Sequence, residues 1–438
     1  MKFLTQAVNG LPEYGALKSY VQKKALPAAV TGVSGIHKAN IIYSLCSQLG
    51  RRAFVVAGDE AEANRLCLDL KAMGLSPMFY PLRDFSLHDT EGSSHEYEHQ
   101  RLAVLRNVKN GKCNAVVCCI DAALQYTIPP DEMEKHTVTI KTGEGIGMEN
   151  AVTALLQGGY EDAPQIDGAG QFSRRGGILD FYPPGLSQPV RAEFFGDEID
   201  TLSFFDPVSQ RRTDSTESVT VFPASEVLIA KPDITAKKID RLASQLRGKT
   251  APAAKAVLAR ESAKLREGLH IGCADKYISL VYDRPASLFD YFADDMVLFV
   301  NEPVKSKERM KSVVWQWGED VRDLLADGTL CRGLSSFTYD YAYAAECFSK
   351  YGAVYLDDFV HGGYDTPVMG QVNMTARQGS AWGGNIGLLA DDLSGMLEKK
   401  WSCAVLAGTE RSARTTAEDL LARGINAFYS EDPETIKR

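Results

Sequence analysis

The chain has 438 residues, of which 45% are apolar and 24% charged, a composition typical of a globular protein with room for roughly three domains. Its formal net charge is −9, whereas chains that wrap nucleic acid by themselves are usually basic, so binding DNA is not the expected role of this stretch as a whole. Residues 1–20 hold no long apolar run, and no segment reaches the about eighteen apolar residues of a membrane span, so neither a signal peptide nor a membrane segment is expected.

The first part of the chain predicts strands that alternate with helices. The predicted strands are LPAAVTG (26–32), RAFVVAG (52–58), MFYP (78–81) and NAVVCCI (114–120), and the predicted helices are IIYSLCSQLG (41–50) and EAEANRLCLDLKAMG (60–74). Apolar runs of this kind between periodic helices are typical of a parallel sheet that is covered on both faces.

After Pro129 and Pro130 the pattern changes to short alternating strands separated by turn residues. These strands are expected within GQFSRRGGILDFYPP (170–184), PVRAEFFGDEIDTLSFFD (189–206) and SVTVFPA (218–224). The pattern predicts a small α+β insertion that contains a β-meander. A charged helical stretch is expected at about residues 233–268, followed by a buried strand in DMVLFVNEP (295–303).

The last part of the chain returns to an α/β pattern. CAVLAG (403–408), SARTTAEDLLARG (412–424) and INAFYS (425–430) predict one strand–helix–strand unit. Two strands alone bury little core, so we expect the natural polypeptide to continue beyond this unit.

The cysteines indicate the compartment. The chain has nine, without a C-x-x-C pair, and most lie in apolar runs. This is typical of buried thiols in a reducing cytosol, so we expect a cytoplasmic protein without a disulfide framework or a zinc site.

The segment TGVSGIHKAN (31–40) is close to a phosphate-binding loop, G-x-x-x-x-G-K-[ST]. Gly32 takes the first position and Lys38 the lysine, and Gly35 lies between them. His37 replaces the second glycine, so a side chain obstructs the backbone where it must approach phosphate. Ala39 replaces the Ser or Thr whose hydroxyl binds Mg²⁺. Lys38 can still attract an anion at a helix N-terminus, and an ordinary strand–turn–helix remains the alternative.

The second half of such a nucleotide site is an acid at the end of a buried strand. In VLFVNEP, Asn301 stands where the Mg²⁺-binding Asp is expected, and Glu302 follows it. An amide is a poor substitute for a carboxylate on a hard cation. Alone, this segment is an ordinary turn after a strand, but together with the altered loop it indicates a nucleotide-binding fold that has lost its function.

Residues 95–99, HEYEH, match the zinc-binding pattern H-E-x-x-H. On a helix, His95 and His99 lie one turn apart and Glu96 is placed to act as a base. No recognisable motif supplies a third ligand, and the following apolar residues at 102, 105 and 108 favour the start of a core-facing helix. We therefore expect no metal site.

Residues 159–223 closely resemble the UvrA-binding insertion shared by the excision-repair helicase UvrB and the transcription-repair coupling factors (Mfd). The motifs that carry the resemblance are RRGGILDFYPP, RAEFFGDEID and FDPVSQR. The resemblance covers most of the chain, weakly at residues 1–30 and 230–270. UvrB keeps an intact phosphate loop and a tyrosine-rich hairpin, and both are missing here. These departures, with Asn301, match the amino-terminal UvrB-homology region of the coupling factors.

The resemblance implies an α/β fold. A degenerate RecA-like, P-loop NTPase-type parallel-sheet domain is interrupted by a small α+β insertion and followed by a second α/β domain. The expected division is residues 1–125 (first part of the RecA-like domain), 126–215 (UvrA-binding insertion), 216–345 (second part of the RecA-like domain) and 346–438 (linker and incomplete third domain).

The resemblance also implies a partner surface. The arginine of the family motif R-G-x-I-x-D makes the contact with UvrA and falls on Arg175. Arg174 beside it adds a second charge, and Phe172 on the same strand supplies apolar contact. A solvated surface arginine remains the alternative for Arg175, and core packing the alternative for Phe172.

For the whole protein, the resemblance implies recruitment of UvrA to stalled RNA polymerase in nucleotide excision repair. It also implies autoinhibition through an intramolecular contact with the carboxy-terminal domain. RNA polymerase and double-stranded DNA are contacted by a carboxy-terminal part that these residues lack, and ATP and Mg²⁺ serve that translocase. This segment is expected to be inactive and to bind no cofactor. The alternative is a UvrB-like excision-repair ATPase with a variant phosphate loop.

Overall fold

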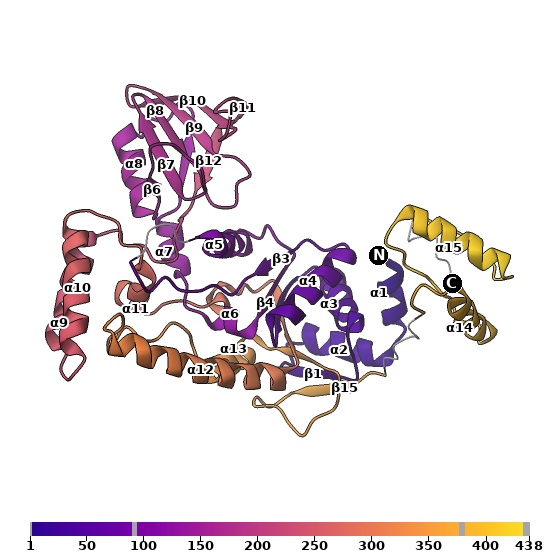
Figure 1. The fold of residues 1–438 in the computed structure, drawn as a ribbon. Coiled ribbons are helices and arrows are strands. Elements are labelled where there is room, and N and C mark those ends of the chain that lie inside the picture. Colours follow the sequence, from indigo (N-terminus) through magenta and orange to yellow (C-terminus); the bar gives the residue numbers. More distant parts are fainter. Residues whose placement is uncertain (1, 90–93, 376–381, 432–438) are drawn as a thin grey trace.

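The computed structural model describes residues 2–89, 94–375 and 382–431. Figure 1 shows a large α/β domain, an antiparallel domain that projects from it, a helical hairpin at one end, and a small carboxy-terminal unit. The described residues include no helix that is both long enough and apolar enough to span a membrane.

The large domain is built on a seven-stranded sheet in the order β15-β1-β14-β13-β2-β4-β3. Every neighbouring pair is parallel. The strands are β1 (Ala28–Thr31), β2 (Arg52–Ala57), β3 (Pro77–Tyr80), β4 (Ala115–Cys119), β13 (Met296–Asn301), β14 (Val354–Asp357) and β15 (Gly370–Asn373). Strands from both sides of the insertion therefore share one sheet, which confirms the predicted interrupted α/β fold.

Two strands of this sheet come from a segment that the sequence analysis placed with the linker and third domain. β14 pairs with β1 and β13, and β15 pairs with β1 at the edge. The reason is burial, because all four residues of β14 are buried and need strands on both sides. Residues up to Asn373 thus belong to the large domain.

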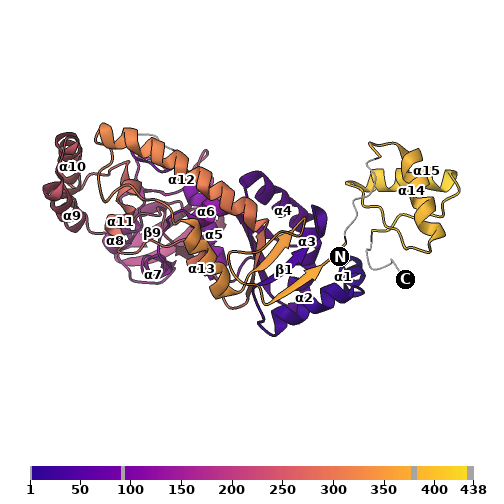
Figure 2. The same cartoon turned by 90° about the horizontal axis from the view of Figure 1, so that it is seen from below.

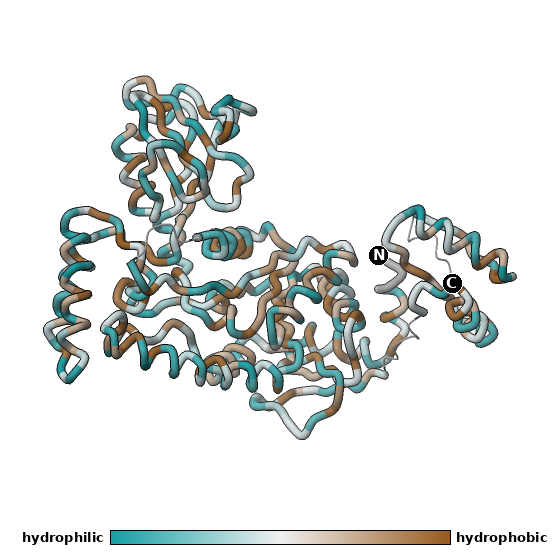
Figure 3. Tube along the Cα trace, viewed as in Figure 1, coloured by the Kyte–Doolittle hydropathy of each residue, from teal (hydrophilic) through white to brown (hydrophobic). Residues whose placement is uncertain are grey.

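Every residue of β1, β4, β13 and β14 is buried. Successive side chains of a strand point to opposite faces, so the sheet is covered on both faces. Figure 3 shows hydrophobic stretches through the interior of this domain. The covering helices are α1 (Lys2–Asn9), α2 (Pro12–Gln22), α3 (Ile36–Leu49), α4 (Glu60–Ala72), α5 (Glu96–Lys109), α6 (Ile120–Leu124), α12 (Pro303–Ala326) and α13 (Tyr341–Tyr351), with a short 3-10 helix η2 (Leu288–Tyr291).

The inserted domain has its own core and sheet. Its six strands lie in the order β11-β10-β9-β8-β7-β6, and β12 pairs with β5 in a second ladder. The elements are α7 (Pro130–Lys135), β5 (Val138–Lys141), α8 (Met148–Gln157), β6 (Glu161–Asp162), β7 (Gln171–Arg175), β8 (Ile178–Phe181), β9 (Val190–Phe195), β10 (Glu198–Phe205), β11 (Arg212–Ser215) and β12 (Ser218–Val221). Strands β7 to β10 are antiparallel neighbours, which confirms the predicted meander.

The charged helical stretch forms a hairpin of two helices, α9 (Pro232–Gln245) and α10 (Ala251–Arg266). The chain turns between them at Gly248, whose φ of +102° suits glycine, and a proline lies in the first turn of α10. A separate apolar cluster joins the hairpin to residues 271–281 and 331–334, including η1 (Ala274–Tyr277) and α11 (Ile278–Val281).

The carboxy-terminal unit contains α14 (Ile386–Glu398) and α15 (Glu410–Ala422) around a small apolar cluster. The helix at 412–424 was predicted, but the flanking strands at 403–408 and 425–430 were wrong, because neither segment is a strand in the structure. A strand exists only where a neighbour supplies its hydrogen bonds, and in the described residues these segments form no ladder.

Candidate functional site

The altered phosphate loop lies between β1 and α3, as its sequence predicts, and is closed by its neighbours. The end of β15 packs directly on it, since the Met374 amide donates to the Thr31 carbonyl at 2.8 Å. A Cβ at Gly32, where φ is +78°, would lie 1.9 Å from the Met374 carbonyl oxygen. Gly32 is therefore required by close backbone packing, independently of any phosphate. Gly35, with φ +51°, is the residue before α3.

The lysine of the loop is buried and already paired. Lys38 is 3% exposed, and its Nζ lies 2.6 Å from Glu302 Oε1 and 2.7 Å from Asp358 Oδ1. Glu302 Oε1 also accepts the Asp358 amide at 2.8 Å. The carboxyl ends of parallel strands meet at one edge, which brings the residues after β13 and β14 to this helix N-terminus. Carboxylates of the chain thus take the place of an incoming anion.

The residues around Lys38 lack groups that bind a nucleotide and Mg²⁺ in an intact phosphate loop. Ala39 is fully buried and supplies no hydroxyl, and His37 is half-buried in the first turn of α3. Asn301 is 1% exposed, and its Oδ1 has no hydrogen-bond partner among the described residues. Of the predicted site residues, the structure brings Lys38 and Glu302 into direct contact.

The carboxylates at this edge carry opposite pKa shifts. Burial raises the pKa of Asp357, although Tyr364 donates to its carboxylate at 2.7 Å. Burial also opposes ionisation of Asp358, but the hydrogen bond and charge of Lys38 hold the pKa of Asp358 below its usual value. The sequence analysis missed Asp358. The available signal was the pair of aspartates that directly follows the apolar run of β14.

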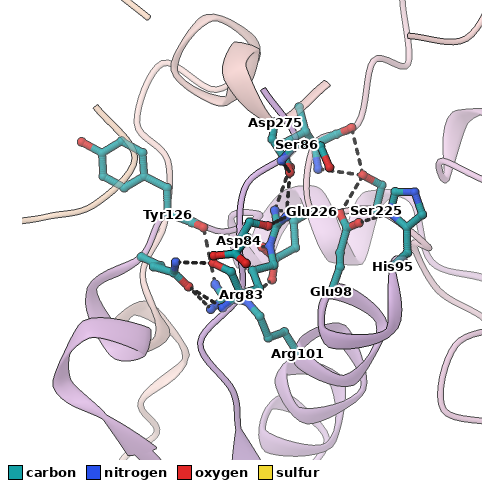
Figure 4. Close-up of polar contacts among 12 residues, drawn as sticks. Arg83, Asp84, Ser86, His95, Glu98, Arg101, Tyr126, Ser225, Glu226 and Asp275 are labelled. Atoms are coloured by element: carbon teal, nitrogen blue, oxygen red, sulfur yellow. Dashed lines mark hydrogen bonds and ion pairs between the residues drawn. The ribbon is translucent and has the colours of Figure 1, made fainter. Parts of the chain in front are cut away.

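The HEYEH segment contributes to a junction between domains (Figure 4). His95 Nδ1 lies 2.8 Å from Glu98 Oε2, and the buried Glu98 accepts the Ser225 hydroxyl at 3.0 Å and the Glu226 amide at 2.7 Å. Burial disfavours the charged form, yet Arg83 and His95 hold the pKa of Glu98 well below its usual value. In the described part of the chain, no group of three or more His, Cys, Asp or Glu is placed to bind a metal.

A buried ion network continues this junction (Figure 4). Glu226, which follows the last strand of the insertion, pairs with Arg101 of α5 at 2.7 Å and with Arg83 at 2.9 Å. Arg83 also binds both oxygens of Asp275 in η1, at 2.7 and 2.8 Å. All four side chains are at most 7% exposed. The network ties the exit of the insertion to the large domain.

The predicted partner residue Arg175 ends β7 at a tight hairpin with β8. Its side chain is 49% exposed, and one guanidinium nitrogen donates to Asp180 Oδ2 at 2.8 Å. Asp180 is 1% exposed and also accepts two hydrogen bonds from Arg191, at 2.7 and 2.8 Å. The aspartate of the R-G-x-I-x-D motif therefore pairs with the arginine of the same motif, while about half of the Arg175 side chain stays exposed.

The neighbouring predicted residues differ from one another. Arg174 is exposed and pairs with Glu149 of α8 at 2.8 Å. Phe172 is 1% exposed and belongs to the core of the insertion, so it is not available to a partner. Along β7 the side chains change from buried at Phe172 and Ser173 to exposed at Arg174 and Arg175, so exposure increases toward the β7–β8 turn.

Phe195 was not singled out from the sequence. It is 84% exposed at the end of β9, and the amide of the preceding residue donates to the Gly177 carbonyl at 2.8 Å. This bond places Phe195 beside the β7–β8 turn and thus close to Arg175. The available signal was the second Phe of RAEFFGDE, which comes directly before a glycine turn.

Comparison with known proteins extends these observations. Residues 138–227 match the model of the UvrB interaction domain. The chain is 26% identical over 419 residues to the transcription-repair-coupling factor of Bacillus subtilis, covering 93% of this chain and 35% of that protein. It is 28% identical over 326 residues to that of Staphylococcus haemolyticus, and 25% identical over 319 residues to that of Staphylococcus aureus strain MRSA252, covering 71% of this chain and 27% of each relative.

The chain thus spans only about a third of the length of the curated relatives that it matches. The predicted resemblance is nevertheless confirmed along most of the chain. The chain is similar over most of its length to a part of the transcription-repair-coupling factors, and its inserted domain matches the UvrB interaction domain.

Proposed function

We propose that this chain is a recruitment and scaffold module that binds UvrA for nucleotide excision repair. The observation that carries the proposal is the half-exposed guanidinium of Arg175, anchored on the buried Asp180, within the segment that matches the UvrB interaction domain. The anchor limits the rotamers of a long side chain before a partner arrives, which lowers the entropy lost on binding.

Arg175 and Phe195 are the main residues of the proposed contact surface, at one end of the inserted sheet. A guanidinium with free donors pairs with a carboxylate of a partner in a planar fork. An exposed aromatic ring beside it supplies apolar area at little conformational cost. Arginine and large aromatic residues are the side chains most often found at the energetic centre of interfaces. Arg174 lies next to this surface and is part of the same proposal.

We further propose that the RecA-like domain has become a structural scaffold that binds no nucleotide. Lys38 is neutralised by two carboxylates of the chain, and a triphosphate would bring more negative charge to the same edge. In this proposal, ATP, Mg²⁺, RNA polymerase and double-stranded DNA are bound by parts of the longer protein outside these residues, and a contact with its carboxy-terminal domain masks the UvrA surface. The alternative is a UvrB-like excision-repair ATPase, which requires that Lys38 leave its ion pairs.

The test of recruitment is the Arg175→Ala variant. Loss of an anchor arginine is expected to weaken UvrA binding by about 2 kcal/mol, which is roughly 30-fold in the dissociation constant. Arg212→Ala is a matched control, because Arg212 begins the opposite edge strand β11 and its side chain is 48% exposed and paired with Glu193 of β9. The control is expected to bind UvrA normally. Equal losses in both variants, or none in Arg175→Ala, would place the contact elsewhere.

A separate titration tests the scaffold proposal. We expect this chain to show neither binding of ATP with Mg²⁺ at micromolar concentrations nor hydrolysis. Saturable nucleotide binding that is lost in a Lys38→Ala variant would favour the UvrB-like alternative.

A further inference from the structure

The helical hairpin carries a charge opposite to that of the rest of the chain. We define the basic hairpin as residues 231–267, which contain α9, α10 and the turn between them. This segment holds ten Lys and Arg but four Asp and Glu, whereas the whole chain has a net charge of −9. The overall acidity therefore conceals a strongly basic element, and a local concentration of charge is what decides electrostatic binding.

The acidic side chains of the basic hairpin are mostly engaged by its own packing. Glu261 is 1% exposed and pairs with Lys276 at 2.6 Å. Asp240 pairs with Arg266 and accepts the Ser262 hydroxyl at 2.8 Å. The exposed acids that remain are Asp233 and Glu267, one near each end of the segment. Little negative charge is left to neutralise the surface between them.

Six of the basic side chains are exposed and have no carboxylate within ion-pair distance among the described residues. They are Lys231, Lys237, Arg241, Arg247, Lys249 and Arg260. Lys237 and Arg241 are one helical turn apart and share a face of α9. That face leads to the turn, where Arg247 and Lys249 follow. The result is a row of cations without carboxylate partners along α9 to the tip of the basic hairpin.

The row is free because the opposite faces of both helices are used for packing. Ala236, Ile239, Leu258 and Leu265 lie in the cluster that attaches the basic hairpin to the large domain. Figures 1 and 2 show α9 and α10 at the outer end of that domain in two orthogonal views, with no other element on their outer side. The row therefore faces away from the body of the described structure.

We propose that the basic hairpin binds the phosphate backbone of duplex DNA without reading its sequence. A DNA strand carries one phosphate per about 3.4 Å of helix axis, so a row of cations on one helix face meets several phosphates at once. Exposed Ser244, Gln245 and Thr250 near the tip add neutral donors of the kind that contact phosphate oxygens. The proposal is independent of Arg175 and of UvrA.

The composition of the basic hairpin distinguishes duplex DNA from other acidic partners. Residues 231–267 contain no Phe, Tyr or Trp, and proteins that hold single strands rely on aromatic stacking of bases. Protein interfaces need apolar or aromatic anchors at their centre, and the large exposed apolar side chain here is Ile234, at the start of α9. A surface with many positive charges and few exposed apolar or aromatic side chains is typical of non-specific contact with a phosphate backbone.

The test compares the whole chain with a variant of four neutral substitutions, Lys231→Gln, Lys237→Gln, Arg241→Gln and Lys249→Gln. Binding to a fluorescent 30-base-pair duplex of arbitrary sequence is followed by anisotropy over a salt series that starts at 50 mM. Because each neutralised phosphate contributes about −0.9 to the slope of log K against log salt, we expect the variant to lose roughly 3 units of slope and at least tenfold in affinity. Arg247 is left intact because it bonds to carbonyls at the end of α9.

The matched control removes the same charge elsewhere through Lys23→Gln, Lys71→Gln, Lys112→Gln and Lys399→Gln, all at exposed positions. We expect the control to bind within twofold of the parent chain, and both variants to keep the parent's circular dichroism spectrum and thermal midpoint. Absence of binding by the parent chain at 50 mM salt, or equal losses in both variants, would overturn the proposal. Tighter binding to single-stranded DNA or to polyglutamate than to the duplex would overturn it as well.

Discussion

The phosphate loop and the β7–β8 hairpin both hold a cation against carboxylates of the chain, but they bury opposite partners. At the loop, the cation is inside, since the Lys38 side chain is 4% exposed and Asp358 is 33% exposed. At the hairpin, the anion is inside, since Asp180 is 1% exposed and Arg175 is 49% exposed. The buried cation is paired with two carboxylates of the chain. The exposed guanidinium of Arg175 pairs with a buried carboxylate and keeps N–H donors for a binding partner.

The number of donors strengthens this difference. A lysine ammonium has three N–H donors, and two of them face Glu302 and Asp358. The guanidinium of Arg175 has five donors, and a single hydrogen bond to Asp180 fixes it. Arg191 also pairs with Asp180, so the negative charge of Asp180 does not depend on Arg175 alone for neutralisation. The first arrangement serves the fold, and the second leaves the arginine free for a partner.

The largest effect is predicted where both partners of an ion pair are buried. Glu226→Gln leaves Arg83 and Arg101 without their shared carboxylate, and breaking a fully buried pair costs about 3–5 kcal/mol of unfolding free energy. Urea denaturation measures it. The control is Glu149→Gln, which breaks an exposed pair with Arg174 and is expected to change stability by less than about 1 kcal/mol. A similar loss of unfolding free energy in both variants would show that burial does not determine how much these ion pairs contribute to stability.

An intermediate effect is predicted for Lys38→Met. The variant leaves Glu302 and Asp358 close together with the exposed Lys305, whose Nζ lies 3.9 Å from Glu302 Oε2, as the neighbouring cation. The lost charge-assisted hydrogen bonds of Lys38 are worth about 1.5–3 kcal/mol. If Lys38 instead awaits an anion, the variant is expected to be neutral in stability and to abolish phosphate binding.

The pH dependence of the Lys38→Met effect has a defined sign. The folded protein lowers the pKa of Asp358 from 3.8, so the stabilisation by Lys38 is present above that pH and is lost as pH falls through the lowered value. The gap between the parent and Lys38→Met is therefore expected to be full near pH 7 and to shrink below about pH 4. Burial is the main cause of the raised pKa of Asp357 and Lys38 is not among its causes, so we expect its opposite contribution largely to cancel in the difference.

Several strands that are buried on both faces were predictable, but β14, whose four residues are all buried, was not predicted. Strands β1, β2, β4 and β13 are continuous apolar runs, and each was predicted. β15 was not, because one of its four residues is buried and its position depends on pairing with β1, more than 300 residues away in sequence. The opposite error at 403–408 has the same cause, since an apolar run becomes a strand only beside a neighbour.

The candidate sites were predictable as motifs but not as contacts. Lys38 could be identified from the motif of the altered loop. Its partner Asp358 follows β14, and only the order of strands in the sheet brings the two residues together. The R-G-x-I-x-D motif named Arg175 and contained Asp180, but their ion pair depends on the hairpin geometry. Residue type alone did not separate core from surface, because Phe172 and Phe195 of the same domain are 1% and 84% exposed.

The smallest effect is predicted for restoring the phosphate-loop residues themselves. His37→Gly combined with Ala39→Ser recreates G-x-x-x-x-G-K-S, yet it leaves Lys38 on its two carboxylates and Asn301 at the strand end. We expect no detectable binding of a fluorescent ATP analogue with Mg²⁺. The same two substitutions combined with Glu302→Gln and Asp358→Asn free the lysine and are expected to give weak, salt-sensitive phosphate binding. Binding of the ATP analogue by the two-residue variant would mean that the missing glycine and hydroxyl, and not the ion pairs of Lys38, are what prevent nucleotide binding.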